Sequence, residues 1–185
     1  ILNIVTGYGD KIGDTLVTDE RVRMISFTGG TEAGVNIVHK AGLKKIGMEL
    51  GSNSPVIVLA DCDFLPAVEN CVSGAFWAAG QNCIGVQRIY VEEALFDRFA
   101  ETFAEVTKKY RIGDKMDEKT DMGPMIEEKE AVRVEQWIRE AVDGGAKVLA
   151  GGKRKGTLVE PTVLVNTPRG SKLDCQEVFG PVVSL

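Results

Sequence analysis

Short apolar segments alternate with longer amphipathic segments along the whole chain, and these two patterns distinguish strands from helices. Runs of apolar and β-branched residues predict strands at residues 1–5, 23–28, 44–50, 56–60, 86–91, 147–149 and 158–165. Apolar side chains that recur every three or four positions predict helices at residues 10–17, 30–41, 64–79, 93–110 and 127–142. Alternation at this spacing is typical of an α/β fold, in which crossover helices connect the strands of a parallel sheet.

Two of the predicted helices carry an apolar stripe suited to burial. In the helix at residues 64–79 the stripe consists of Val68, Cys71, Val72, Ala75, Phe76 and Ala79. In the helix at residues 93–110 it consists of Phe96, Phe99, Phe103 and Val106. Because these side chains recur at helical spacing, we interpret them as core residues rather than as a cofactor-binding stack.

Glycine-rich turns follow the first two predicted strands. In a parallel sheet, ligands bind at the carboxyl ends of the strands, and residues 7–9 and 29–30 fall at such ends. The turn at residues 29–34 leads into a helix, so its free backbone amides suit a phosphate or a ribose. It is neither a GxGxxG fingerprint nor a P-loop, and a plain tight turn remains the alternative interpretation.

Composition restricts the class of protein. The chain has 185 residues, of which 44% are hydrophobic and 26% charged, which suits one substantial core or one domain and part of another. The net charge of -5 leaves no basic stripe to neutralise phosphates, so nucleic-acid binding is not expected. No apolar run approaches the roughly 18 residues of a membrane span, so no membrane association is expected.

The four cysteines and the single histidine also limit the chemistry. The cysteines are widely spaced and form no CxxC pair, so a disulfide framework is not expected and a cytoplasmic location is predicted. With His39 as the only histidine, no metal site is expected. The chain opens on a strand-like segment without an initiator methionine and closes on an apolar run, so we expect a fragment truncated at both ends.

Two residues are candidates for catalysis. Cys83 lies in a polar, glycine-flanked connection between a predicted helix and a predicted strand, where a thiol is exposed and held in position as a nucleophile requires. A free cysteine is more often a small buried hydrophobe, which is the alternative for this residue. Glu49 lies between an apolar strand end and a turn of small residues. A thiol and a carboxylate in such positions are groups that covalent catalysis uses.

The stretches around these two residues carry a family resemblance. MELGSNSP at residues 48–55 and GQNCIGVQR at residues 80–88 resemble the glutamate and cysteine signatures of the aldehyde dehydrogenase superfamily. ISFTGGTEAG at residues 25–34, DMGPMI at residues 121–126 and EVFGPV at residues 177–182 agree with the same family. The resemblance extends over essentially the whole chain in the family's order. It implies an aldehyde-dehydrogenase-like α/β fold built from parallel-sheet units.

The resemblance also implies an NAD(P)-dependent oxidation of an aldehyde to a carboxylic acid. Cys83 would add to the carbonyl, and Glu49 would activate the water that hydrolyses the resulting thioester. The family's contacts with the cofactor, NAD or NADP, correspond to Gly9, Gly13, Gly29, Gly30, Gly34, Leu50, Glu177 and Phe179. Gly30 departs from the serine that the family usually carries there, and Gln176 stands where the family often has an acid.

In the family's layout, residues 1–48 would be the C-terminal part of a Rossmann-like cofactor-binding domain and residues 49–185 an incomplete catalytic domain. The expected partner is a small aldehyde, the full-length protein is expected to be a homo-oligomer, and the isolated chain is expected to have little or no activity. Two alternatives are a coenzyme-A-acylating relative and a non-enzymatic truncated member. Glu49 argues against the first, because acylating members typically lack this base. The intact pair of Cys83 and Glu49 argues against the second, whereas the expected truncation favours it.

Overall fold

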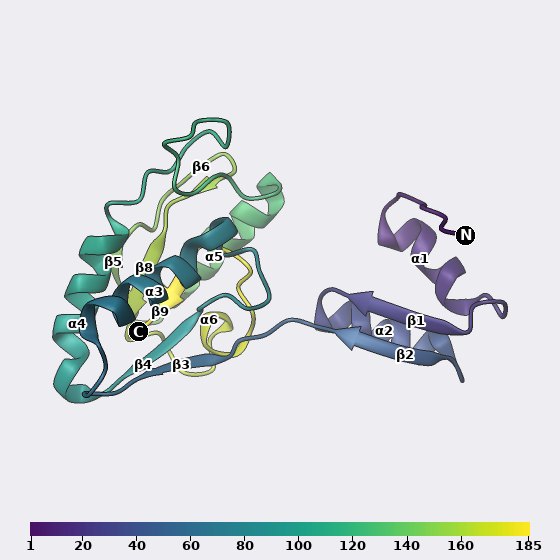
Figure 1. Ribbon diagram of the computed structural model, residues 1–185, viewed down its shortest axis with the longest axis horizontal. Helices are drawn as coiled ribbons and strands as arrows, with labels where there is room; N and C mark the ends of the chain where they lie inside the picture. The colour runs from purple at the N-terminus through teal and green to yellow at the C-terminus, as the bar shows by residue number, and fades with distance from the viewer. The chain divides into compact units, whose positions relative to one another are not determined.

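The computed structural model describes residues 1–185 and shows two compact units, Ile1–Gly51 and Ser52–Leu185 (Figure 1). The smaller unit contains two helices and two strands, and the larger unit contains the remaining elements. The boundary falls within the stretch MELGSNSP, so Glu49 belongs to the first unit and the residues from Ser52 onward belong to the second. None of the helices is both long enough and apolar enough to span a membrane.

The smaller unit is a β-α-β crossover preceded by a helix. Helix α1 (Gly9–Thr18) leads to strand β1 (Met24–Thr28), and helix α2 (Thr31–Ala41) connects β1 to strand β2 (Lys45–Glu49). The two strands pair in parallel, and a tight turn cannot join parallel strands, so a crossover helix is needed between them. The four predicted elements at residues 10–50 are therefore confirmed, with small differences at their ends.

Residues 1–5 form no strand, and this prediction was wrong. The segment is exposed along its whole length and pairs with no strand of the chain. Its apolar sequence ILNIV has strand propensity, but a strand also needs a partner that bonds its backbone N–H and C=O groups. The pattern of apolar residues indicates strand propensity, but it does not show whether a partner strand is present.

A five-stranded sheet forms the centre of the larger unit. Its strands, in order across the sheet, are β3 (Pro55–Val58), β4 (Arg88–Val91), β9 (Val182–Ser184), β8 (Thr162–Val165) and β5 (Lys147–Ala150). β5 is antiparallel to β8, and the other neighbours are parallel. The predicted parallel sheet with crossover connections is confirmed, with an antiparallel strand at one edge.

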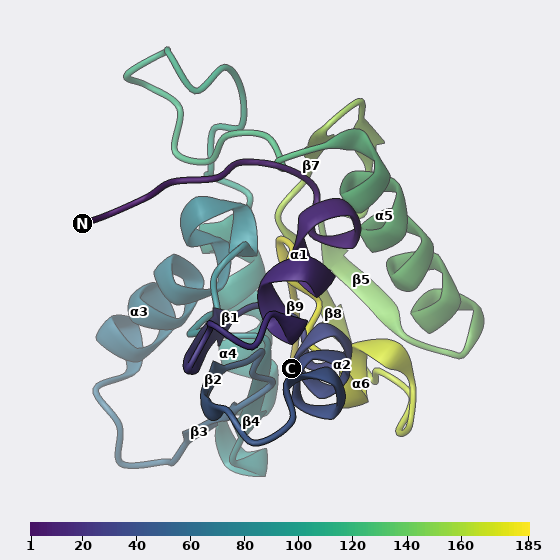
Figure 2. The same cartoon turned by 90° about the vertical axis from the view of Figure 1, so that its right-hand side faces the viewer.

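Helices cover both faces of this sheet (Figure 2). α3 (Phe64–Phe76) and α4 (Glu93–Thr107) share one hydrophobic core with the sheet, while α5 (Glu128–Asp143) and the short α6 (Lys172–Cys175) share the other. Every residue of β8 is buried, as expected for a strand that is covered on both faces. α6 was not predicted, because four residues are too few to show a helical period.

Successive side chains of β8 pack alternately into the two hydrophobic cores on either side of the sheet. Val163 packs with α3 and α4 and Leu164 packs with α5, and both are fully buried. The first core contains Phe76, Phe99 and Phe103, all without exposed surface, and the rings of Phe76 and Phe103 meet edge to face with centroids 6.4 Å apart. All six members of the stripe predicted for residues 64–79 are buried, so that core prediction is confirmed.

Helix α3 ends three residues earlier than predicted. It stops at Phe76, and Trp77–Gly80 form a short 3-10 turn in place of a last helical turn. Ala78 and Ala79 adopt φ angles of 52° and 55°, in the left-handed region that L-residues rarely occupy. Because alanine is the strongest helix former, the local pattern could not indicate this reversal.

The predicted strand at residues 158–165 is split in two. Pro161 has no N–H to donate to a strand ladder, and it separates β7 (Leu158–Val159) from β8. β7 pairs instead with β6 (Arg154–Lys155) in a small antiparallel hairpin. β6 was not predicted, because it belongs to a run of three basic residues between glycines, which carries no apolar strand signal.

Candidate functional site

In the smaller unit, the glycine turn and the glutamate stretch meet at the carboxyl ends of β1 and β2. Thr28 lies opposite Glu49 at the end of the paired strands, and the Gly29 amide donates to the Glu49 carbonyl at 3.0 Å. The Glu49 side chain is exposed. A β-carbon at Gly34 would lie 2.7 Å from Leu50 Cδ2, so α2 packs closely on the segment that follows β2. The structure therefore brings four predicted site residues together.

Helix α2 begins directly at this junction. Gly30 is its N-cap residue and provides no side-chain cap, so the first amides of the helix lack intrahelical partners. Those amides and the positive end of the helix dipole favour a bound anion. A β-carbon at Gly30 would meet no atom within 4 Å, so the structure has room for a small side chain such as serine at this position.

Gly9 and Gly13 lie on α1 rather than at a strand end. Gly9 is the first residue of the helix and Gly13 lies in its middle. A β-carbon at either position would meet no atom within 4 Å, so packing within the unit does not require glycine there. The predicted contact of these two residues with a cofactor stays a prediction.

Cys83 lies in the loop between the 3-10 turn and β4, and its side chain is exposed. Gly80, with a φ of 67°, continues the left-handed run before it and turns the chain back toward the sheet. Asn82 braces the loop, because its Nδ2 donates to the Trp77 carbonyl and its own carbonyl accepts from the Gly85 amide, each at 3.3 Å. An exposed thiol on a braced loop is placed as a nucleophile requires.

Two other stretches singled out in the sequence pack against this loop. Gln81 Oε1 accepts from the Ile126 amide at 2.9 Å, which joins the stretch DMGPMI to the cysteine loop. Gly80 packs directly on the backbone of Gly180, since a β-carbon at Gly80 would lie 2.5 Å from the Gly180 carbonyl carbon and still closer to its oxygen. The cysteine loop therefore contacts both the DMGPMI and the EVFGPV stretches.

Glu177 and Phe179 lie on the loop that leads into β9. The Ser52 amide donates to Glu177 Oε1 at 3.2 Å. Arg133 Nη2 donates to the Val178 carbonyl at 2.8 Å and so anchors the peptide between the two residues. Phe179 has a φ of 44°, which is strained for an aromatic residue, and its side chain is partly exposed. The loop therefore presents a carboxylate and an aromatic ring from an anchored backbone.

Sequence reasoning missed two polar residues, Gln87 and Arg88, in the segment predicted as an apolar strand. β4 begins only at Arg88, and Gln87 before it is buried. Arg88 donates through Nη2 and Nε to the Asn53 carbonyl at 2.6 and 3.0 Å, and Asn53 Nδ2 donates to the Asp174 carbonyl at 2.9 Å. The sequence did carry a signal for them: an amide side chain and a guanidinium stand within a segment predicted as an apolar strand. Such groups indicate nearby hydrogen-bond partners, because a buried polar group needs them.

The family model described as the aldehyde dehydrogenase family matches residues 1–185. The chain belongs to this family. It is 51% identical over 183 residues to an aldehyde-dehydrogenase-like protein of Sinorhizobium fredii, and this match covers 98% of the chain and 36% of the relative. The chain spans 36–40% of the length of the curated relatives that it matches.

Solved structures share the fold. Glyceraldehyde-3-phosphate dehydrogenase GapN of Methanocaldococcus jannaschii, in complex with NADP, matches with a TM-score of 0.95 at 44% identity, over 98% of this chain and 40% of that one. Betaine aldehyde dehydrogenase of Staphylococcus aureus, in complex with NAD+, matches with a TM-score of 0.94 at 34% identity, over 97% of this chain and 37% of that one. The predicted aldehyde-dehydrogenase-like fold is confirmed.

The five stretches of this aldehyde dehydrogenase chain fall into two groups. ISFTGGTEAG and the first half of MELGSNSP belong to the smaller unit, while GQNCIGVQR, DMGPMI and EVFGPV belong to the larger one. Within each unit the stretches contact one another: through the backbone at Gly29 and Glu49 and at Gly80 and Gly180, and through the Gln81 side chain at Ile126. The proposed catalytic residues are thus divided, with Glu49 in one group and Cys83 in the other.

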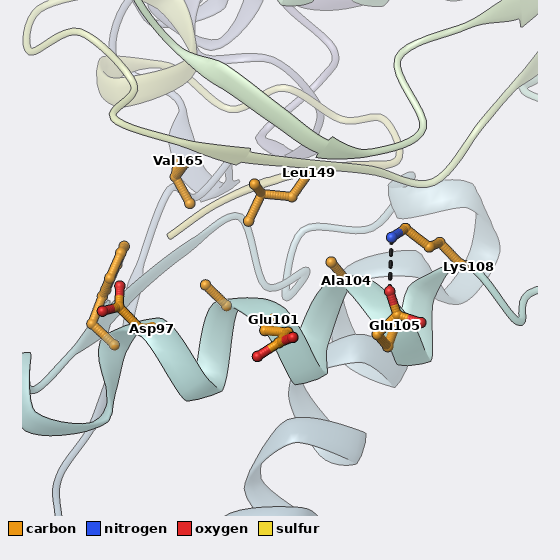
Figure 3. Close-up of a pocket in the computed structure, with 9 residues that line it drawn as sticks. Asp97, Glu101, Ala104, Glu105, Lys108, Leu149 and Val165 are labelled. Carbon is orange, nitrogen blue, oxygen red and sulfur yellow. Dashed lines mark hydrogen bonds and ion pairs between the residues drawn. The ribbon is translucent and has the colours of Figure 1, made fainter.

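A groove of about 440 Å³ lies along α4 and contains none of the predicted site residues (Figure 3). Its lining combines apolar and charged side chains, namely Phe96, Asp97, Ala100, Glu101, Ala104, Glu105, Lys108, Leu149 and Val165. Lys108 Nζ bonds Glu105 Oε1 at 2.8 Å, and this contact lowers the pKa of the Glu105 carboxyl. No cysteine or histidine lines the groove.

The cysteines of the chain differ in exposure, and this predicts their reactivity. Cys83 and Cys175 are exposed and Cys71 is buried. Burial, with a smaller contribution from neighbouring Cys62, raises the pKa of the Cys71 thiol. The thiolate is the form that attacks iodoacetamide and displaces iodide, so we expect Cys83 and Cys175 to react at least about ten times faster than Cys71. A labelling time course read by peptide mass spectrometry measures each rate.

The variant Cys83→Ser identifies the signal that belongs to the loop thiol, because it removes one fast-reacting site and should leave the Cys175 rate unchanged. Equal rates for Cys71 and Cys83 in the native protein would contradict the burial of the one and the exposure of the other.

Proposed function

We propose that this chain carries the nucleophile and part of the cofactor site of an NAD(P)-dependent dehydrogenase that oxidises an aldehyde to a carboxylic acid. The observation that supports this most strongly is the backbone contact between Gly80 and Gly180. It holds the Cys83 loop against the stretch that contains Glu177 and Phe179. Covalent catalysis needs such fixed placement, because a shift of about 1 Å in a reacting group can cost roughly a hundredfold in rate.

Cys83 is the proposed nucleophile. Hydride leaves readily only from a tetrahedral carbon, so the thiolate first adds to the aldehyde carbonyl and forms a carbon–sulfur bond. The backbone amide of Cys83 donates to the oxygen that becomes negative in this adduct. Release of hydride from the same carbon then leaves a thioester on Cys83.

Glu49 is the proposed general base for the second step. Its carboxylate accepts a proton from water while the water oxygen adds to the thioester. The carbon–sulfur bond breaks, the carboxylic acid is released and the Cys83 sulfur leaves as thiolate. The exposed position of Glu49 at a strand end supports this role, because the side chain is free to turn toward water.

Each unit, taken by itself, has residues that suit one part of a nicotinamide cofactor. The uncapped start of α2 at Gly29 and Gly30 suits a pyrophosphate, and the Glu177 carboxylate suits ribose hydroxyls. The remaining proposed contacts are Gly9, Gly13, Gly34, Leu50 and Phe179. When bound, NAD(P)+ accepts the hydride that the tetrahedral carbon releases. The structural relatives in complex with NADP and with NAD+ support both forms as candidates.

We propose that residues 1–48 are the C-terminal part of the cofactor-binding domain and that residues 49–185 belong to the catalytic domain. The division of the structure after Gly51 supports a boundary in this region. A small aldehyde is the proposed substrate, and a homo-oligomer is the proposed state of the complete protein. Since the chain spans 36% of the Sinorhizobium relative, we propose that the isolated chain has little or no activity.

The test is the oxidation of a panel of aldehydes by the complete native protein, with NAD and with NADP, followed by the absorbance of the reduced cofactor. We expect at least one aldehyde to be turned over and the carboxylic acid to be found by mass spectrometry. The isolated 185-residue chain, assayed in parallel, should be at least about a hundredfold slower, because hydride transfer needs complete positioning of the cofactor.

A parallel reaction with added coenzyme A separates the two enzymatic alternatives. Formation of acyl-coenzyme A, with no acid when coenzyme A is left out, would assign the protein to the acylating type. An absence of reduced cofactor under every condition would overturn the dehydrogenase proposal itself.

A further inference from the structure

We propose that Gln87 is a positioning residue, which holds the Glu177 loop in the geometry that binds the cofactor. Gln87 lies four positions after Cys83 and is only 5% exposed. Its Nε2 donates to the Ser52 carbonyl at 2.8 Å, and its Oε1 accepts from the Val178 amide at 2.7 Å. This inference rests on the proposed function, because it concerns the cofactor site of that reaction.

The contacts of Gln87 explain why an amide side chain is needed at this position. One side presents a carbonyl that requires a donor, and the other presents an N–H that requires an acceptor. A neutral primary amide supplies both from one planar group, whereas a carboxylate or an ammonium supplies only one kind. Leaving either backbone group unpaired in a buried site is costly, which makes the pairing specific.

Both backbone segments that Gln87 binds lead directly to Glu177. Ser52, whose carbonyl accepts from Gln87, donates its own amide to Glu177 Oε1 at 3.2 Å. Val178, whose amide donates to Gln87, is the next residue after Glu177, and its carbonyl accepts from Arg133 Nη2 at 2.8 Å. The Glu177 carboxylate is thus held in two ways, by the backbone of the next residue, Val178, and by the Ser52 amide that donates to it. The Gln87 side chain bonds both Val178 and Ser52.

Gln87 also directly precedes β4, the strand that follows the nucleophile. Its carbonyl accepts from the Ser184 amide at 2.9 Å, which ties the same residue to β9. Gln87 therefore joins three stretches that the proposed reaction uses: the one after Glu49, the one after Cys83 and the one that contains Glu177. It contacts none of the reacting atoms, and its effect acts through Glu177.

The decisive variant is Gln87→Met in the complete native protein, because methionine has a similar length and can make neither hydrogen bond. We expect the KM for the cofactor to rise about tenfold, since the variant leaves two buried backbone groups unpaired, while kcat changes less than about threefold. In a Glu177→Gln background the same substitution should add less than about twofold, because residues that act through one another are not additive. Gln87→Asn, which is too short to reach both groups, should act in the same direction and serves as a second variant.

Thr107→Val is the matched control. Thr107 is also buried and polar, and its Oγ1 donates to the Phe103 carbonyl at 2.8 Å within α4. This control should lower the melting temperature and leave the cofactor KM unchanged. If Gln87→Met likewise lowers only the melting temperature, the positioning role is overturned. The same holds if the increases in cofactor KM caused by Gln87→Met and by Glu177→Gln multiply in the double variant.

Hydrogen exchange of the Val178 and Ser52 amides gives a readout that does not require turnover. We expect both amides to exchange faster in Gln87→Met than in the native protein and to be unchanged in Thr107→Val. If the native protein oxidises no aldehyde, the proposed function fails, while faster exchange at both amides still supports the structural connection through Gln87. Unchanged exchange at both amides would overturn that connection whatever the activity.

Discussion

Replacing Cys83 with alanine is expected to abolish aldehyde-dependent cofactor reduction by the complete protein. Without the thiolate no tetrahedral adduct forms, and the loss of an enzyme's nucleophile typically costs at least about 10³-fold in rate. The measurement is the initial rate of cofactor reduction with the best aldehyde of the panel. Cys175→Ala is the matched control, because it removes the other exposed thiol, and its rate should equal that of the native protein.

The companion variant Glu49→Gln separates the two proposed steps. If Glu49 serves only hydrolysis, the variant should still reduce about one equivalent of cofactor per active site in a rapid burst, and then turn over about 10²- to 10⁴-fold more slowly than the native protein. Mass spectrometry should detect the acyl group on Cys83 after the burst. Undiminished steady turnover by Cys83→Ala would refute the nucleophile, and unchanged steady turnover by Glu49→Gln would refute the base.

Replacing Gly80 with alanine is expected to destabilise the larger unit by on the order of 3–5 kcal/mol, which combines left-handed strain with overpacking. The added methyl group would lie 2.5 Å from the Gly180 carbonyl carbon and 2.9 Å from the Pro181 nitrogen. Both are backbone atoms, so no side-chain rotation can relieve the contact. Because Gly80 leads into the Cys83 loop, activity should fall together with stability. Urea denaturation of the native protein and the variant measures the difference.

Gly156→Ala is the control for this substitution. Gly156 also has a positive φ, 59°, but a β-carbon there would meet no atom within 4 Å. It should therefore cost only the left-handed strain of an alanine, about 1–2 kcal/mol. The loss of unfolding free energy in Gly80→Ala minus that in Gly156→Ala therefore measures the cost of the contact with Gly180. Equal losses of stability would show that the two backbones do not meet as closely as the structure indicates.

The sequence was sufficient for the architecture and insufficient for the turn before Cys83. Helical and strand periods predicted the alternation of elements, because each amphipathic segment buries its apolar face in the way its period requires. They failed at Ala78 and Ala79, where two strong helix formers adopt left-handed φ angles. The cause is the packing of the next residue, Gly80, against Gly180. A contact between residues that are distant in sequence cannot be predicted from the local pattern of apolar residues.

The candidate site was predictable only in part, for a related reason. Cys83 and Glu177 were predicted as site residues from the motifs that surround them, and the structure shows the stretches that carry them meeting in the larger unit. Gln87 lies inside the cysteine signature GQNCIGVQR, but its role was missed, because the motif alone does not show which groups its side chain contacts. Its importance comes from two backbone partners, Ser52 and Val178, that are distant in sequence.

The place of β9 in the sheet has a consequence for how the larger unit is made. β9 follows the other four strands of this sheet in sequence, yet it lies between β4 and β8 and joins the two halves of the sheet. On the ribosome, the pairs β3–β4 and β5–β8 can form early, but each keeps an open edge until Val182–Ser184 emerge. Until β9 pairs with both, the backbone N–H and C=O groups along one edge of β4 and one edge of β8 have no strand partner, and such an edge can pair with another chain.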